Sequence, residues 1–166
     1  MAETIVVGTD GSQTATKAVA EAARMAKTLG GDVHVVSAYE SVVGANEHGP
    51  RIHNPMSVSA GTPEVGAEKG VGNVLEPLTD SGVDAILEEA ESSVRLSGVN
   101  VAAHGVKGHP ADALLEVAGE VGATLIVVGN TGRHGIKEHV LGNVASKVTH
   151  RARCNVLIVA ADAPHE

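Results

Sequence analysis

The sequence predicts an α/β protein with a doubly wound, Rossmann-like parallel sheet of five strands in the order 3-2-1-4-5 and helices on both faces. Apolar strand-like runs alternate along the chain with helical patterns, which is typical of β-α-β units. The strand-like runs are apolar almost throughout rather than at every second position, as expected for a sheet covered on both faces. At 166 residues, the chain is expected to form a single domain over 1–166.

The first strand is expected at 4–8. A helix should follow Ser12, a good N-cap residue, and end at Gly30. The face of this helix toward the sheet is expected to consist of Ala15, Ala18, Val19, Ala22, Met25 and Leu29. The second strand is expected at 33–38.

The second half of the chain continues the alternation. A helix carries an apolar stripe from Val83 to Val94, and a helix starting at Pro110 places proline in its favoured first turn. The remaining elements are expected at 99–104 (strand), 124–128 (strand), about 143 onward (helix) and 155–160 (strand).

Residues from about 41 to 80 interrupt this pattern. The segment contains six glycines and four prolines, shows almost no periodicity, and is too long for an ordinary connection. It is interpreted as an insertion in the domain. Partial disorder is the favoured interpretation, and a lid over the ligand crevice is the alternative.

Composition limits the classes of partner. The net charge of −8 disfavours nucleic acids and anionic membranes, and Tyr39 is the only aromatic residue where single-stranded nucleic-acid binding would need several. Cys154 is the only cysteine, so no intramolecular disulfide can form, which fits a reducing compartment. The chain shows no signal peptide and no apolar run long enough to span a membrane, so a cytoplasmic location is expected.

The region from Gly129 to Arg153 is the strongest candidate for a binding site. It holds five basic residues and one acid, a net charge of +4, although the rest of the chain carries −12. A glycine turn between a strand and a helix N-terminus lets backbone N–H groups converge on phosphate. In doubly wound sheets, ligands bind at the carboxyl ends of the strands. The strands at 4–8 and 124–128 are neighbours in the predicted order, so their ends would form one crevice.

Four motifs resemble the universal stress protein family over nearly the whole chain outside 41–80, and one of them is the run from Gly108 to Leu114 at the helix that starts at Pro110. The first strand leads into Gly8-Thr9-Asp10-Gly11-Ser12, and the last strand begins with Cys154-Asn155-Val156. Between them, Gly129, Gly132 and Gly142 keep the family's nucleotide-motif spacing of glycine, two residues, glycine, nine residues, glycine. The resemblance implies an adenine-nucleotide ligand (ATP, AMP or cyclic AMP), with Mg²⁺ accompanying the nucleotide.

The same resemblance implies a role for each matching residue. Thr9 and Asp10 would line the adenosine end of the crevice, and Asp10 would help to hold the divalent ion. Ala38 would present backbone groups to adenine, and Gly129 would approach the ribose. The full set of expected binding residues is Thr9, Asp10, Ala38, Val128, Gly129, Gly132, Arg133, Gly142, Asn143 and Val144.

Asn143 departs from the family motif, which has serine or threonine at this position. Its amide can still donate to phosphate, but it is larger and would crowd a terminal phosphate, which leaves the choice among ATP, AMP and cyclic AMP open. Simpler interpretations also stand: Asn143 as a helix N-cap, and Asp10-Gly11-Ser12 as a mere strand-to-helix turn. Cys154 is interpreted as a small packed hydrophobe.

The favoured function is that of a sensor or signalling protein in a stress response. The chain lacks a dinucleotide fingerprint, a Walker A lysine motif and a serine-hydrolase elbow, so catalysis is not expected. The two alternatives are an interaction module that binds no nucleotide and a slow ATPase. The pairs His104 and His109, and His134 and His139, do not share a helix face, so surface histidines are expected rather than a metal site.

The last strand predicts an assembly. A flat apolar strand at 155–160 on the sheet edge is an aggregation hazard unless it is paired or covered. Antiparallel pairing of two copies through this strand would satisfy it with two-fold symmetry. The family resemblance implies the same homodimer.

Overall fold

A computed structural model describes residues 2–39, 80–131 and 141–160 of the chain. The expected insertion at about 41–80 therefore lies outside the described residues, apart from Asp80, which opens a helix. The elements are β1 (Thr4–Gly8), α1 (Gln13–Leu29), β2 (Asp32–Tyr39), α2 (Asp80–Leu96), β3 (Val101–Lys107), α3 (Pro110–Glu120), β4 (Leu125–Gly129), α4 (Asn143–Arg151) and β5 (Asn155–Val159).

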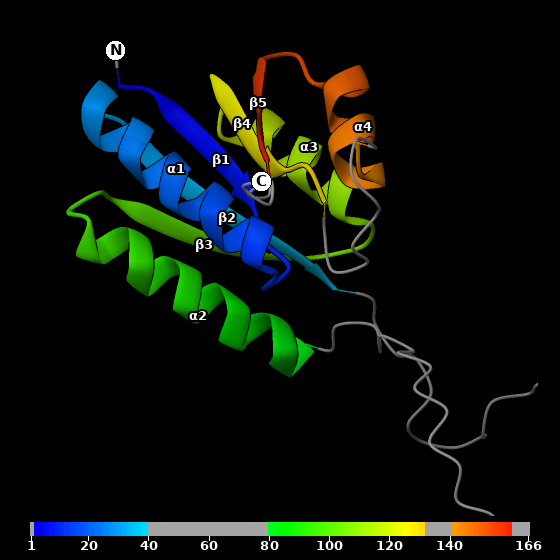
Figure 1. The fold of residues 1–166 in the computed structure, drawn as a ribbon, viewed down its shortest axis with the longest axis horizontal. Coiled ribbons are helices and arrows are strands. Elements are labelled where there is room, and N and C mark those ends of the chain that lie inside the picture. The colour runs from blue at the N-terminus through cyan, green and yellow to red at the C-terminus, as the bar shows by residue number, and fades with distance from the viewer. Residues whose placement is uncertain (1, 40–79, 132–140, 161–166) are drawn as a thin grey trace, which may run out of the picture. The chain divides into compact units, whose positions relative to one another are not determined.

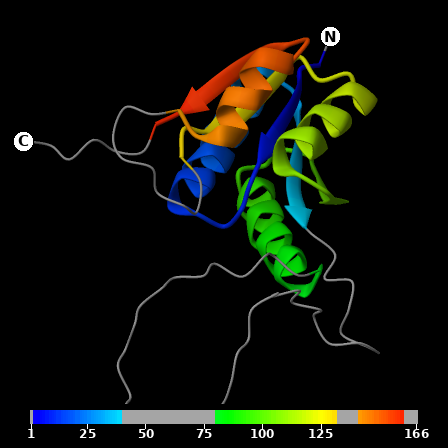
Figure 2. The same ribbon diagram turned by 90° about the vertical axis from the view of Figure 1, so that its right-hand side faces the viewer.

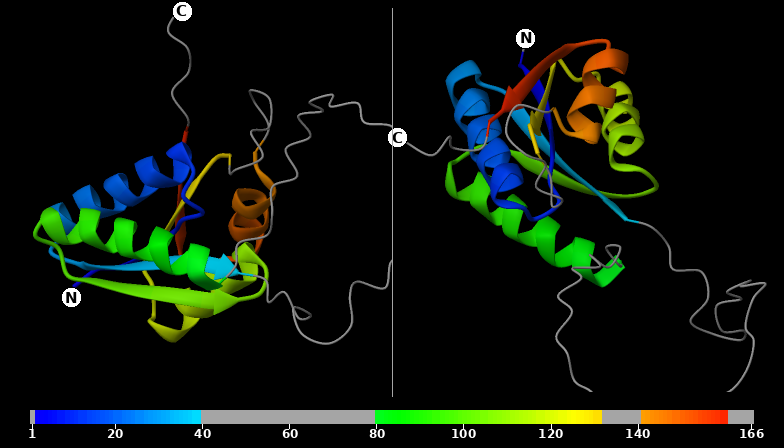
Figure 3. Two further views of the ribbon diagram at one scale, coloured as in Figure 1. Left: turned by 90° about the horizontal axis from the view of Figure 1, so that it is seen from below. Right: turned by 45° about the vertical axis from the view of Figure 1, so that its right-hand side comes forward.

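The five strands form one parallel sheet in the order β3-β2-β1-β4-β5, which confirms the predicted fold class. Helices α1 and α2 lie side by side on one face, and α3 and α4 cover the other (Figures 1 and 2; α1 and α2 are also seen in Figure 3). The register pairs Val7 of β1 with Val35 of β2 and with Val127 of β4, so β1 is hydrogen-bonded along both edges.

Two apolar clusters form the core, one on each face of the sheet. In β1, Ile5 and Val7 pack toward α1 and α2, whereas Val6 packs toward α3 and α4, and none of the three is exposed. Successive side chains of a strand point to opposite faces, so an uninterrupted apolar strand contributes to both clusters. This is the physical reason for the unbroken apolar runs in the sequence.

Alanines dominate the face of α1 that meets the sheet. Ala18, Ala22 and Ala26 are fully buried, and their small side chains allow the helix to lie close to the strands. Ser12 caps the helix as predicted, because its Oγ accepts from the N–H of Ala15 at 3.2 Å. The prediction that Leu29 faces the sheet was wrong, since its side chain is 50% exposed. Leu29 is the last residue of α1, where the helix has passed the apolar cluster.

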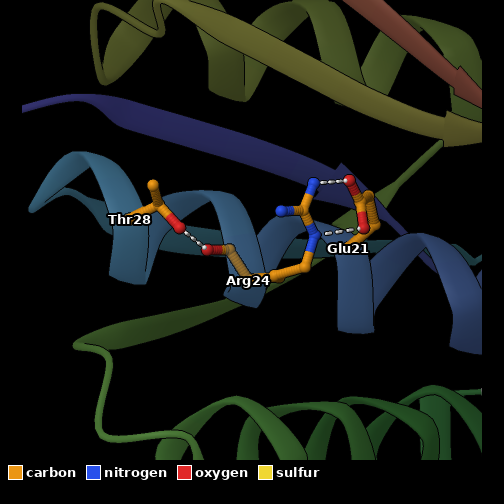
Figure 4. Close-up of polar contacts among 3 residues, drawn as sticks. All are labelled: Glu21, Arg24 and Thr28. Carbon is orange, nitrogen blue, oxygen red and sulfur yellow. Dashed lines mark hydrogen bonds and ion pairs between the residues drawn. The ribbon is translucent and has the colours of Figure 1, made fainter.

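The outer face of α1 is polar. The Arg24 guanidinium donates through Nε to a Glu21 carboxylate oxygen at 2.8 Å and through Nη2 to the other oxygen (Figure 4). This hydrogen bond holds the pKa of Glu21 below its ordinary value. The Thr28 hydroxyl donates to the Arg24 carbonyl oxygen at 2.9 Å. These contacts lie on the exposed surface and contribute little to stability.

The predicted stripe of α2 is confirmed at Val83, Leu87, Ala90 and Val94, which are all buried, whereas Ile86 of the same stripe is only half-buried. The third strand was placed too early: it was expected at 99–104 and is observed at Val101–Lys107. Val99 is apolar because it fills the core from the turn after α2, where it is 7% exposed, and not because it pairs in the sheet.

Within the described ranges, no helix is long and apolar enough to cross a membrane.

The turn between α1 and β2 gives a direct test of this packing. Gly30 adopts a left-handed conformation (φ 68°) with open space around it, whereas a Cβ on Gly31 would lie 2.2 Å from the Glu3 carbonyl oxygen. Gly30→Ala should therefore cost about 1–2 kcal/mol of unfolding free energy through backbone strain alone. Gly31→Ala should cost more, because backbone atoms must move. Urea denaturation measures both, and equal tolerance of the two substitutions would contradict the close approach of Glu3.

Candidate functional site

Two turns meet at the carboxyl edge of the sheet. One follows β1 and leads into α1, and the other follows β4 and leads toward α4. Because β1 and β4 pair in parallel, their carboxyl ends are neighbours, as expected from the sequence. This is the switch point of the topology, where the connections leave toward opposite faces of the sheet.

The turn after β1 is fixed by its own polar groups. The Thr9 N–H donates to the Val36 carbonyl oxygen of β2 at 2.9 Å, and the Thr9 side chain is buried. Asp10 Oδ1 accepts from the N–H of Ser12 at 3.0 Å. Gly11 has φ 76°, a conformation that glycine adopts at little cost. The half-buried Asp10 carboxylate is thus held at the strand end.

The turn after β4 holds the start of α4 in place. The Asn130 N–H donates to the Val159 carbonyl oxygen of β5 at 2.8 Å, and the Asn130 carbonyl oxygen accepts from the Gly142 N–H at 2.7 Å. A Cβ on Gly142 would lie 2.8 Å from that same Asn130 oxygen. Gly142 therefore permits the close approach that brings it next to the turn after Gly129.

The N-terminus of α4 opens toward this turn. Gly142 is the N-cap residue and Asn143 the first helical residue, so the interpretation of Asn143 as the N-cap was wrong. Glycine has no side chain to accept from the first N–H groups of the helix, which also lack carbonyl partners within it. The exposed Asn143 side chain lies at this end of the helix. Such a helix end favours an anion.

Thr14 joins the two turns, a contact that was not predicted from the sequence. It lies in the first turn of α1 with its side chain 7% exposed. Its Oγ1 lies 3.4 Å from the Thr131 Oγ1, and the Thr131 hydroxyl donates to Asn130 Oδ1 at 3.3 Å. A Cβ on Gly129 would lie 2.7 Å from Thr14 Cγ2. Gly129 thus lets α1 pack directly on the end of β4.

The other expected binding residues differ in how accessible their side chains are to a ligand. Ala38 is half-buried near the end of β2, and Val144 is half-buried in the first turn of α4. The Val128 side chain is 3% exposed in the core, so only its backbone is available to a ligand. Gly132 and Arg133 lie outside the described residues, as does the rest of 132–140.

A hollow between α3 and α4 involves none of the expected binding residues. Its floor is apolar (Leu115, Ala118, Ile126), and its charged lining residues are Glu116, Glu120, Arg151 and Arg153. Cys154 lines it as well, half-buried against the core, and burial raises the pKa of its thiol. Because the thiolate is the reactive form, this agrees with Cys154 as a packed hydrophobe.

A pair of histidines was also not foreseen from the sequence. His34 of β2 and His104 of β3 lie 70 residues apart, yet His34 Nδ1 is 2.9 Å from His104 Nε2. Burial lowers the pKa of His34, the neighbouring His104 lowers it further, and Asp32 opposes the shift. Spacing along the chain cannot reveal such a pair, because it arises only when the two strands are in register.

Comparison with known proteins places the chain among relatives of similar length. The profile of the universal stress protein family matches residues 1–160. A universal stress protein of Mycobacterium tuberculosis is 32% identical over 158 residues, which cover 95% of each chain. Two solved structures share the fold. One is a universal stress protein in complex with cAMP, with 29% sequence identity and a TM-score of 0.66; the match covers 97% of this chain and 98% of the other. The other is a universal stress protein from Archaeoglobus fulgidus in complex with dAMP, with 23% identity and a TM-score of 0.61; the match covers 95% of this chain and 97% of the other.

The contact between Thr14 and Gly129 can be tested by a double-mutant cycle. Gly129→Ala should cost about 1–3 kcal/mol of unfolding free energy, because the new methyl group overlaps Thr14 Cγ2. In a Thr14→Ser background, which lacks that methyl group, the same substitution should cost at least about 0.5 kcal/mol less. Urea denaturation of the four proteins gives the coupling. If the unfolding free-energy costs of the two substitutions are additive, the Thr14 side chain of α1 does not pack against Gly129.

Proposed function

The chain belongs to the universal stress protein family, and we propose that it binds an adenine nucleotide between the carboxyl ends of β1 and β4 and acts as a nucleotide sensor in a stress response. The cAMP complex of a structural relative at 29% identity supports the class of ligand. The sensor role is proposed because the described residues of the site offer binding groups but no recognisable pair of acid and base.

One observation carries the proposal: the Gly142–Asn130 hydrogen bond of 2.7 Å seats the N-terminus of α4 on the turn after β4. Residues that are distant in sequence thereby lie along one edge of the sheet, with free N–H groups at the N-terminus of α4 and the Asp10 carboxylate at the carboxyl end of β1. A nucleotide needs this polarity, with donors for its phosphate and acceptors for its sugar and base.

The proposed ligand lies across this edge. Its adenosine end contacts Thr9, Asp10 and the backbone of Ala38, and its ribose lies near the backbone of Val128 and Gly129. Its phosphate meets Gly142, Asn143 and Val144 at the start of α4, together with Gly132 and Arg133. Mg²⁺ accompanies the ligand only if it is ATP, since Mg²⁺ is commonly held through substrate phosphates and one or two carboxylates.

Asn143 makes a single-phosphate nucleotide the favoured ligand. Its side chain is exposed at the first position of α4, where a small hydroxyl would leave more room. An amide can donate to one phosphate, but its bulk stands where a longer phosphate chain would pass. Cyclic AMP or AMP is therefore proposed ahead of ATP.

Titration calorimetry with cyclic AMP, AMP, ATP–Mg²⁺ and adenosine tests the proposal. Asn143→Asp keeps the shape of the side chain, and a carboxylate suits a helix N-terminus, so the fold should be retained. The new charge should weaken binding of the preferred phosphate-bearing ligand by at least about tenfold, because like charges would be juxtaposed. Affinity for adenosine should not change. Asn155→Asp, at the start of β5, is the matched control and should bind like the unmodified protein.

Each other result identifies a different function. Failure of all four ligands, with folded protein free of co-purified nucleotide, would overturn nucleotide sensing and favour an interaction module. Metal-dependent phosphate release that is lost in Asp10→Ala would favour a slow ATPase. If Asn143→Asp binds the phosphate-bearing ligand with unchanged affinity, the phosphate does not bind at the N-terminus of α4.

We further propose that two copies pair through the free edge of β5. Its residues after Asn155 are half-buried in the single chain, and its outer edge has no strand partner within the described residues. Antiparallel pairing of two such edges gives a closed two-fold dimer.

Sedimentation equilibrium should give twice the mass of one chain. Ile158→Lys should shift the equilibrium to the monomer, because a lysine on an edge strand opposes pairing. Ala103→Lys, an exposed position on the opposite edge strand β3, is the control and should remain dimeric. A monomeric unmodified protein, or dissociation by the control alone, would contradict pairing through β5.

A further inference from the structure

Two imidazole nitrogens face one another across the β2–β3 pair. His34 and His104 occupy diagonal positions, since His34 is in register with Ala102 and His104 with Val36. Both rings lie on the sheet face that carries α3 and α4, because Val36 packs into that cluster and alternate residues of β2 share its face. The ring centroids are 5.2 Å apart with an interplanar angle of 31°.

We propose that His34 Nδ1 and His104 Nε2 together bind a divalent late transition-metal ion of the copper or nickel type. The site lies within the sheet, away from the strand ends to which the nucleotide is assigned.

The separation of the donor atoms supports this class of ion. Imidazole nitrogens bind such ions at about 2.0–2.1 Å, so two of them at a right angle are about 2.9 Å apart. In the hydrogen-bonded pair without an ion the two nitrogens lie 2.9 Å apart, so the rings already bring them to the separation that right-angle coordination needs. A tetrahedral ion such as zinc would need about 3.3–3.4 Å. Square-planar or tetragonal coordination by nitrogen and oxygen is typical of Cu²⁺ and Ni²⁺.

The pair is partly exposed, and an acidic residue lies near it. Both histidines are half-buried on the edge side of the sheet, since β3 is an outer strand, so solvent reaches the pair. Asp32 lies two residues before His34 on the same strand face and acts on it electrostatically, so a negative charge lies nearby. In the described part of the chain no group of three histidine, cysteine or acidic side chains could hold a metal, so water completes the coordination.

Binding requires a rearrangement of protons and a rotation of each ring. In the free protein, one ring donates an N–H to the other, and which ring donates depends on the tautomer. The donor ring shifts its proton to its far nitrogen, which leaves both facing nitrogens with a free lone pair. A rotation of each ring then turns the lone pairs from one another toward the ion. Neither ring loses a net proton, and no redox step takes place.

Calorimetric titration of the full chain with Ni²⁺ tests the site through His34→Gln and His104→Gln. Each variant removes one of two ligands, so affinity for one ion per chain should fall by at least about tenfold, since even loss of a second-shell partner costs about 10–100-fold. His150→Gln, exposed on α4, is the matched control and should bind like the unmodified protein. Circular dichroism verifies that each variant is folded.

A measurement on the unmodified protein makes the test independent of the variants' folding. Histidine modification by diethylpyrocarbonate, mapped by mass spectrometry, should be blocked by Ni²⁺ at His34 and His104 and continue at His150. Unchanged affinity in both variants would overturn the proposal. Equal protection of all three histidines, or none at His34 and His104, would also overturn it. Nucleotide binding should be the same with and without Ni²⁺, so failure of either proposal is recognised separately.

Discussion

The burial of β1 is the constraint on which the rest of the structure depends. This strand is paired along both edges, with β2 and β4, and covered on both faces, so Ile5, Val6 and Val7 have no exposed surface. A backbone so enclosed must have its polar groups satisfied by the sheet. The carboxyl end of β1 is consequently fixed, and the turn from Thr9 to Ser12 begins from a rigid point. A binding edge needs that rigidity, because ligand groups must meet their partners with little reorganisation.

Helix α1 transmits this rigidity to the second half of the site. Its alanine face allows close contact with the sheet, and its first turn places Thr14 against Gly129 and Thr131. The series of contacts continues to Asn130, whose carbonyl oxygen accepts a hydrogen bond from the Gly142 N–H. The N-terminus of α4 is thus positioned relative to Asp10 through contacts between main chain and small side chains. Glycine at 129 and 142 serves this packing as well as the proposed approach of a ligand.

The two edges of the sheet have different characters. The β5 edge presents a short apolar strand, which suits pairing with another strand. The β3 edge carries small and polar residues, and it places His104 beside His34 of the neighbouring strand. The proposed dimer contact and the proposed metal site therefore lie at opposite edges of the sheet, on either side of the proposed nucleotide site.

The sequence alone determined the fold class and the motif around Gly129 and Gly142, because these rest on local periodicity, turn residues and spacing. It placed strand 99–104 too early and Leu29 in the core, because an apolar residue can fill a core from a turn or lie exposed beyond it. It also placed the N-cap of α4 one residue late, since Asn143 and Gly142 are both acceptable caps. Only the tertiary structure brought Thr14 to Thr131 and His34 to His104. Those contacts join residues 117 and 70 positions apart, and their geometry is set by sheet register and helix packing, which leave no local trace in the chain.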